Sequence, residues 1–571
     1  WSSDVCSSDL TDYGKYSFST DQWIAAPKDP ADLYTRMAYV RENHWKLTHL
    51  LNYNQTFYKH DIGMLLGFEE ERFVKRTTDT AKLGLIDSSV GDSSSATTPS
   101  SIGGTGEEFT SRSYFGRINY AFDSRYLFEV NMRYDGSSRF APDNRWGLFP
   151  SFSAGWRISE ERFMKGLPID NLKLRASWGK LGNNAIGNYE WQAVYNSAKY
   201  AFGGSLNNGL AITSISNNLL EWESTAITNI GIDFATLRNR LTFEAEFYNK
   251  VTDGILYRPD MYMSLGTASG PRQNIAEVTN RGIEMTLNWQ DRIGKVEYRV
   301  SGNFAYNQNK VSKYKGELQR GWVTDENGNR VYQTNIGDVS TGGSTRVIEG
   351  KMINEYYMLQ PYKGSGNGFN ADGTVNINGG PRDGMIRTVD DMKWLNAMVG
   401  AGYKFYPRQN VSKSGIWYGD YIYADLNGDG VYGNDADNEF QGCSNVPKYN
   451  FGLQASANWK GFDFSMNWSG AAGFKIYYYR LALNSSATIK GYAIGEAIAN
   501  DHYFFDPKNP NDPRTNLSSK NPRLTNNSGN DQSGMTQSSV HLQKGDYIKL
   551  KNLTIGYTLP AVLSKKVYAQ N

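Results

Sequence analysis

The residue types and spacing that best suit chemistry lie in one acidic, glycine-rich stretch, DLNGDGV at residues 425–431. Oxygen-bearing side chains recur there at alternate positions, and glycine provides the sharp turn, as at the start of a calcium-binding loop. Where such a loop carries a bidentate glutamate, this chain has Ala436. The candidate calcium ligands are Asp425, Asn427, Asp429, Val431, Asp435 and Asp437. The alternative is an Asx-rich turn without an ion, and in either case the stretch orders a loop and performs no catalysis.

A second set of candidates consists of charged residues that alternate with apolar ones along predicted strands. They are Glu129, Arg133, Asp135, Lys173, Arg175, Glu244 and Glu246. They could act as acid/base pairs, but the interior of a large barrel is polar simply because it faces water. The five histidines, at positions 44, 49, 60, 502 and 541, are scattered. No Ser-His-Asp order or phosphate-binding glycine loop stands out, so we expect no enzyme, no catalytic residue and no required cofactor.

The elements that must position these residues are strands, and the clearest is a hairpin at residues 114–135. In its second arm the apolar residues alternate with polar ones: Phe128, Val130, Met132 and Tyr134 against Glu129, Asn131, Arg133 and Asp135. Successive strand side chains point to opposite faces, so one face is apolar and the other charged. The arms exceed the about 5–6 residues of common soluble strands and match the roughly 9–11 needed to cross a bilayer.

Composition argues against nucleic-acid binding and does not decide between a transmembrane β-barrel and a soluble all-β protein. The 571 residues hold 60 Lys+Arg against 58 Asp+Glu, with no basic block that would indicate nucleic acid. Two cysteines exclude a disulfide framework, and no apolar run reaches the length of about 18 residues expected of a transmembrane helix. Aromatic residues at 14% and 58 glycines suit either a transmembrane β-barrel or a soluble all-β protein.

The lengths of the connections decide between these architectures. Short connections are expected at 58–60, 123–125, 158–169, 238–239, 293–295 and 460–461, and long ones at about 75–110, 181–225, 252–279, 308–448 and 470–546. Because antiparallel strands cross back and forth, regular alternation puts all short turns on one side, as in outer-membrane barrels with short periplasmic turns. A soluble sandwich gives no reason for this. The sequence therefore predicts an all-β transmembrane antiparallel barrel with about 13–14 strands, the last carrying a bulge near Asn552.

Six motifs, in order, resemble one known family. They are RYDGSSRFAPDNRWGLFPSFSAGWRISEE (133–161), LKLRASWGKLGN (172–183), LLEWESTAITNIGIDF (219–234), NRGIEMTLNW (280–289), ADLNGDG (424–430) and DYIKLKNLTIGYTLP (546–560). Together they resemble the barrel of SusC/RagA-type TonB-dependent outer-membrane transporters of Bacteroidota. The resemblance implies a 22-stranded barrel with an N-terminal plug and a TonB box. We expect residues 11–571 to be a partial barrel without that plug. Residues 1–10 resemble a translated sequencing adapter and are set aside.

The resemblance also implies a function. Such a protein imports glycan oligomers or peptides across the outer membrane of a Gram-negative bacterium, in contact with outer-membrane lipid. A SusD-like surface lipoprotein acts as a lid, and TonB–ExbB–ExbD acts through the missing N-terminal part. The alternatives are a non-transporting receptor or adhesin barrel, a siderophore receptor and, third, an outer-membrane enzyme.

No substrate-binding residue is assigned from the sequence. Loop aromatics such as Trp322, Trp394, Trp417 and Tyr418 could stack on sugar rings or pack the loops, and we favour packing.

Overall fold

The computed structural model describes residues 3–10, 17–18, 25–26, 34–85, 92–214, 216–257, 272–314, 321–324, 330–333, 345–346, 349–406, 410–477, 496–524 and 538–560. Within these residues no helix is both long and apolar enough to cross a membrane.

The dominant element is one antiparallel sheet, which has fourteen strands among the described residues. Its strands, in spatial order, are β1 (Ser3–Leu10), β4 (Tyr34–Phe57), β5 (His60–Leu85), β6 (Ala96–Phe122), β7 (Tyr126–Ser137), β8 (Trp146–Arg157), β9 (Ile169–Asn183), β12 (Glu223–Thr236), β13 (Leu241–Tyr257), β14 (Gln273–Ile293), β15 (Val296–Tyr314), β23 (Tyr449–Trp459), β24 (Phe462–Ala472) and β27 (Tyr547–Tyr557). Spatial order follows chain order throughout, as in an up-and-down barrel. The predicted fold class is confirmed.

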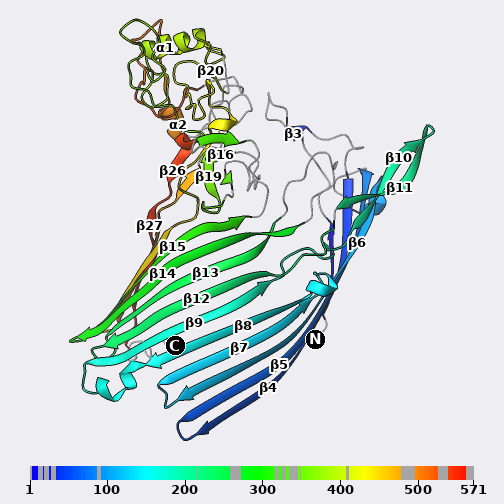
Figure 1. The fold of residues 1–571 in the computed structure, drawn as a ribbon, viewed down its shortest axis with the longest axis vertical. Helices are drawn as coiled ribbons and strands as arrows, with labels where there is room; N and C mark the ends of the chain where they lie inside the picture. Colours follow the sequence, from blue (N-terminus) through cyan, green and yellow to red (C-terminus); the bar gives the residue numbers. More distant parts are fainter. Residues whose placement is uncertain are drawn as a thin grey trace.

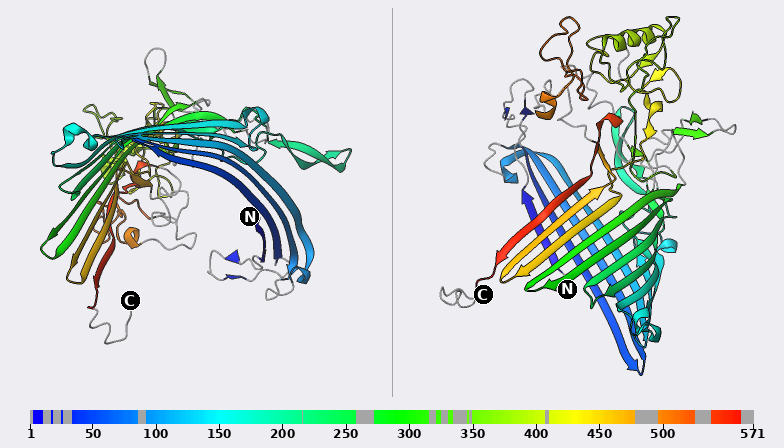
Figure 2. Two further views of the ribbon diagram at one scale, coloured as in Figure 1. Left: turned by 90° about the horizontal axis from the view of Figure 1, so that it is seen from below. Right: turned by 90° about the vertical axis from the view of Figure 1, so that its left-hand side faces the viewer.

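The sheet curves into an open arch, with strands tilted across it (Figures 1 and 2). Its two edge strands, β1 and β27, do not pair with each other within the described part of the chain. The edge strand β1 lies in the residues set aside above and pairs with β4 from Ser3–His44 to Leu10–Met37. That residues 1–10 derive from a sequencing adapter stays a prediction.

All six short connections lie where the sequence predicts them, at one end of the sheet. The turn between β23 and β24 consists of Lys460 and Gly461, with φ of 48° and 89°. Two successive positive φ values define the hairpin turn whose twist matches that of the strands it joins. In β27 the register shifts between Leu550 and Asn552, which confirms the bulge predicted near Asn552.

The two faces of the sheet differ in the way the hairpin pattern predicts. Phe128 and Met132 are 50% and 48% exposed on one face, although both are large and apolar. Across the sheet the same face continues through the pairs Phe128–Ala154 and Val130–Phe152. An apolar face this wide is unfavourable in water, and it fits contact with lipid.

The strands extend further into the predicted long loops than composition suggested. The loop expected at 75–110 is mostly strand, because β5 continues to Leu85 and β6 begins at Ala96. This segment is rich in threonine, whose branched side chain favours extended backbone even where the sequence is polar. The region 181–225 contains a separate hairpin, β10 (Val194–Phe202) and β11 (Ser205–Ser214). Strands β13 and β14 likewise extend into 252–279.

The two longest insertions fold together into one unit, here called the cap module: residues 349–443 and 496–524. It lies at the end of the sheet opposite the short turns (Figure 1). The smaller elements in and around it are β19 (Glu355–Met358), α1 (Val389–Gly400), β20 (Lys404–Phe405), β21 (Val431–Tyr432), β22 (Glu439–Phe440), β25 (Lys475–Tyr477), α2 (Glu496–Asn500) and β26 (Leu542–Lys544). The remaining short strands are β2 (Ser17–Phe18), β3 (Ala25–Ala26), β16 (Gly321–Thr324), β17 (Arg330–Gln333) and β18 (Thr345–Arg346).

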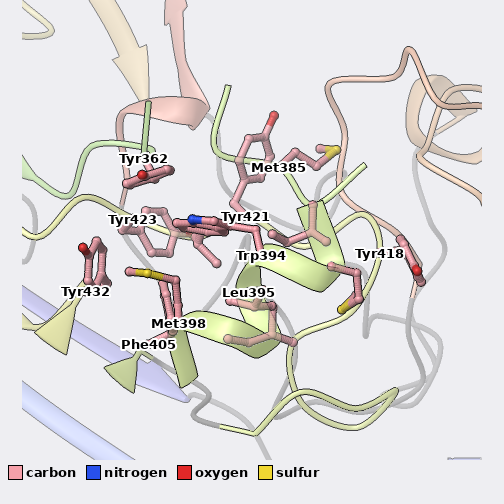
Figure 3. Packing of buried hydrophobic residues seen from close by; sticks show 14 of the residues in the cluster. Tyr362, Met385, Trp394, Leu395, Met398, Phe405, Tyr418, Tyr421, Tyr423 and Tyr432 are labelled. Carbon is pink, nitrogen blue, oxygen red and sulfur yellow. The ribbon is translucent and has the colours of Figure 1, made fainter. Parts of the chain in front are cut away.

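The cap module has its own aromatic core around Trp394 of α1 (Figure 3). The indole is fully buried, stacks on Tyr362 at 5.2 Å between ring centroids and donates from Nε1 to the Asn376 carbonyl at 2.8 Å. Helix α1 begins with a capping box, in which the Thr388 hydroxyl and the Asp391 carboxylate each accept the other's backbone N–H. Its apolar face is thereby fixed against the core.

Two arginines hold the second insertion against the first. Arg387 donates to the carbonyl oxygens of Leu517 and Ser519 at 2.6 and 2.8 Å. Arg523 binds both carboxylate oxygens of the buried Asp420 at 2.8 and 2.9 Å. A bidentate guanidinium–carboxylate contact fixes geometry as well as adding energy, so the two insertions form one rigid unit.

Removing the central indole should open the cap module and leave the sheet intact. We expect Trp394→Ala to cost the module about 3–5 kcal/mol, the usual range for deleting a buried aromatic side chain. Limited proteolysis of outer membranes should then cut within residues 349–443 or 496–524. Phe369→Ala, which removes a 44% exposed ring of the same module, is the matched control and should stay resistant. Equal resistance of both variants would contradict this assignment.

Candidate functional site

The charged residues predicted from the strand pattern lie on the face of the sheet opposite the apolar one. Strand register sets this, because directly paired residues share a face: Arg175 of β9 pairs with Gly231 of β12, which pairs with Glu246 of β13. The next strand places Glu284 opposite Glu246. A polar surface therefore runs continuously across β9 to β14.

Arg175 is the centre of this surface. Its Nε donates to Asp233 Oδ1 at 3.1 Å, and its Nη1 donates to the Glu246 carboxylate. Lys173 Nζ lies 4.0 Å from Asp233 Oδ2. The guanidinium crosses β12 directly above Gly231, where an added Cβ would lie 2.7 Å from Arg175 Cζ. A larger residue at position 231 would push the guanidinium out of the position in which it bridges three strands.

Three of the four remaining predicted charges have local partners. Arg133 Nη2 contacts Asp135 at 3.0 Å, and Glu129 accepts a hydrogen bond from Asn131 Nδ2 at 2.7 Å. The partner of Glu244 on the neighbouring strand is Asp233. Because Asp233 is also a carboxylate, this register pair is not an ion pair. The charges form a polar wall, and they do not converge on one reacting position.

A cavity of about 610 Å³ opens on this wall toward its short-turn end. Its polar lining includes Asp61, Asn119, Glu129, Lys173, Arg175 and Asn229. Small residues leave the space, since Ser153 pairs with Ser177 and Gly155 pairs with Arg175. The wall can therefore hold water or a hydrated polar segment.

A cluster at the short-turn end was not predicted. Glu161 accepts hydrogen bonds from the Tyr126 hydroxyl at 2.7 Å and from Trp156 Nε1 at 3.1 Å, and it contacts Arg125 Nη1 at 3.4 Å. The hydrogen bond from Tyr126, followed by that from Trp156, lowers the pKa of Glu161. Aromatic residues with one polar tip suit the membrane interface, and this carboxylate fixes two of them there. The only indication in the sequence was the short separation between an aromatic and an acidic residue, Trp156 and Glu161, at the connection expected at 158–169.

Outer-membrane barrels carry girdles of aromatic residues at both membrane interfaces, and the aromatic residues at the strand ends of this sheet match that pattern only in part. Trp146, Trp156, Trp178 and Trp459 are exposed on the apolar face, as interfacial residues should be. Tyr248 differs: it shares the polar face with Gly282 and donates to Asn307 Oδ1 at 3.1 Å. Odd and even positions of β13 face opposite sides of the sheet, so Phe247, the residue before Tyr248, faces lipid.

The predicted calcium loop is a network of backbone hydrogen bonds. Asp425 accepts from the amides of Gly428 and Gly430 at 2.7 and 2.9 Å. The fully buried Asp437 accepts from four backbone amides, those of Leu426, Asn427, Gly433 and Asn434. Burial raises the pKa of Asp437 to about 6, against the opposing effect of these amides.

The other predicted ligands complete the turns of the same loop. Asp429 accepts from Val431 N and from the side-chain amides of Asn427 and Asn434, and Asp435 begins a short 3₁₀ turn, Asp435–Asp437. No three acidic, His or Cys side chains converge as a metal site requires, within the residues that the structure describes. The donor set thus fits the ion-free turn better than a calcium site. Calcium binding itself stays a prediction.

The histidines and loop aromatics make mainly structural contacts. His44 contacts Glu71, and His60 contacts the Tyr120 hydroxyl, both on the sheet. Tyr356, Tyr357, Trp394 and Tyr418 are buried in or beside the cap module, which agrees with the packing interpretation. The side chain of Trp322 lies outside the described residues. Trp417 is only partly buried.

The curved antiparallel sheet with one lipid-suited and one polar face defines the wall of an outer-membrane β-barrel. The family model for the TonB dependent receptor-like β-barrel matches residues 1–567. The chain therefore belongs to the TonB-dependent receptor β-barrel family and is of the SusC/RagA type. It is an outer-membrane barrel protein and not an enzyme.

Individual relatives agree with this assignment. TonB-dependent receptor P39 of Formosa agariphila is 30% identical over 542 residues, covering 90% of this chain and 46% of the relative. TonB-dependent receptor SusC of Bacteroides thetaiotaomicron is 28% identical, covering 80% of this chain and 38% of SusC. The structure of the RagAB peptide transporter superposes with a TM-score of 0.69 at 20% identity, over 94% of this chain and 51% of that one. The chain spans about half the length of the relatives it matches.

Breaking the Arg175 bridge should weaken the wall. We expect Arg175→Gln to lower stability by about 1–2 kcal/mol, because two largely buried ion pairs are lost while their carboxylates remain. The temperature at which the folded band converts to the unfolded band on a gel measures this. Glu284→Gln removes a charge that has no ion-pair partner among the described residues, and it should leave that temperature unchanged or raise it. A fall of equal size in both variants would refute the bridge.

Replacing the buried carboxylate of the acidic loop should loosen the loop. Asp437→Asn turns some of the accepting contacts with backbone N–H groups into donor–donor contacts. We expect faster amide hydrogen exchange over residues 425–437, with or without a calcium chelator. Asp435→Asn, at an exposed position, is the control. Slow exchange in the native loop that is lost on chelation alone would instead establish a calcium site.

Proposed function

We propose that this chain forms barrel wall and extracellular cap of a TonB-dependent outer-membrane importer of glycan oligomers or peptides. A SusD-like surface lipoprotein closes over the cap, and TonB–ExbB–ExbD supplies energy through a plug. The residues described here provide a passage, a cap and a surface for the lid, and no chemistry.

The observation that carries this proposal is the continuous polar wall from β9 to β14, backed by a lipid-suited face. A passage for hydrated cargo needs such a wall, because polar solutes cannot cross the hydrocarbon layer unaided. The cap module supports the same function, since it places a rigid folded unit over one end of that wall. A barrel that acted only as an anchor would need neither feature.

Family relationships support the choice of cargo and partners. SusC matches 80% of this chain, and the RagAB peptide transporter structure covers 94% of it. The lipoprotein partner and the TonB complex are inferred for this chain from that resemblance. The choice between glycans and peptides is open to experiment.

The proposal is tested by separating uptake from surface binding. Cells lacking the gene should lose accumulation of fluorescent oligosaccharides or peptides released from their natural growth substrate. Complementation should restore it, and an uncoupler of the proton-motive force should abolish it again. Loss of surface binding with unchanged uptake would identify a receptor or adhesin instead. Loss of ferric siderophore uptake alone would identify a siderophore receptor.

A further inference from the structure

A second cavity lies in the cap module, away from the polar wall. It has a volume of about 650 Å³ and opens between residues 413–418 of the first insertion and 500–524 of the second. This volume is within the range of small-molecule sites, roughly 300–1,000 Å³. Arg523 and Asp420 hold its two sides together, so the cavity is built by the same contact that makes the module rigid.

One wall of this cavity is aromatic. Trp417 and Tyr418 meet edge to face with ring centroids 5.2 Å apart, and Tyr418 meets Phe505 in the same way at 5.1 Å. Tyr418 lies at the margin of the module's core, apart from Trp394 (Figure 3). The core buries Tyr418, whereas Trp417 and Phe505 remain partly exposed toward the cavity. These two rings are available for stacking against a ligand.

Polar groups at the rim supply both kinds of hydrogen bond. The Asn500 side-chain amide makes no hydrogen bond within the described residues, so both its donor and its acceptor are available. His502 Nδ1 lies 3.0 and 3.1 Å from the carbonyl oxygens of Ile498 and Ala499. Because carbonyls only accept, Nδ1 carries the proton, and in the neutral ring Nε2 is left as an acceptor.

The charges around the cavity cancel. Arg514 binds both oxygens of Asp512 and lies over the Phe504 ring, and Arg523 binds both oxygens of Asp420. The remaining lining charges are Lys413 and Asp506, one of each sign. The lining itself carries three cations and one carboxylate, and Asp512 and Asp420, which lie outside the lining, neutralise two of the cations. With Asp506 set against Lys413, the surroundings of the cavity give no net attraction for a charged ligand.

We propose that this cavity binds a neutral pyranose unit of an oligosaccharide. A pyranose ring presents C–H groups to an aromatic face and hydroxyls around its rim, which matches Trp417 and Phe505 in the wall and Asn500 and His502 at the edge. The inference rests on the proposed function, in that it names neutral glycans among the possible cargo. It places a recognition site on the cap, outside the passage.

The test uses the protein extracted from the outer membrane of its own host, in a detergent without a sugar headgroup. Calorimetric titration with maltohexaose, cellohexaose, mannohexaose and xylohexaose should show binding of at least one. Hexagalacturonate and an acidic hexapeptide should not bind. Trp417→Ala and Phe505→Ala should each weaken the binding at least tenfold, and Asn500→Ala about threefold to fivefold.

Two controls make the result decisive. Phe369→Ala removes an exposed ring of the cap module away from the cavity and should bind as the unaltered protein does. Asn500→Ala alters an exposed side chain, so it reports on the site even if Trp417→Ala fails to fold. Absence of binding to all four neutral sugars overturns the inference, as does binding that none of the cavity variants weakens. Tighter binding of the acidic ligands would overturn the neutral class. Uptake that persists in all these cases would leave the importer proposal standing.

Discussion

The backbone of a chain within lipid has no water to bond, so every N–H and C=O there must find a partner in the protein. In this chain the antiparallel ladder meets that requirement from β4 to β24, where each strand pairs on both sides. Pairing fixes the register, and the register fixes which side chains share a face. The polar wall, the apolar face and the Arg175 bridge all follow from that one constraint.

The same constraint explains why the elaborate parts of the molecule lie at one end. Insertions between strands can only leave the ladder where it ends, and the short turns leave no room at the other end. The two longest insertions emerge near each other and share a core, in which Trp394 of the first and Tyr503 of the second are both buried. Arg387 and Arg523 then join segments more than 100 residues apart.

Much of this fold was predictable from the sequence. The alternation of apolar and polar residues over 126–137 predicts the two faces of the sheet. The short turns at 123–125 and 460–461 predict the end of the sheet at which all short turns lie. Both could be predicted because period-two patterns and turn residues are local features of the sequence. The extension of β5 and β6 was missed because threonine-rich polar segments look like loop by composition. The acidic stretch was identified as a turn or calcium loop. The amide contacts of Asp437 favour the turn, and they could not be predicted because they come from residues on both sides of it.

The cap module and the Glu161 cluster could not be predicted, because long-range contacts make both.

Cysteine accessibility across β7 in isolated outer membranes tests the central claim, that this sheet separates lipid from a watery passage. With a small water-soluble thiol reagent, Glu129→Cys, Asn131→Cys and Arg133→Cys should react rapidly. Phe128→Cys, Val130→Cys and Met132→Cys should react slowly until the membrane is dissolved. Equal reaction at odd and even positions in the intact membrane would contradict the account.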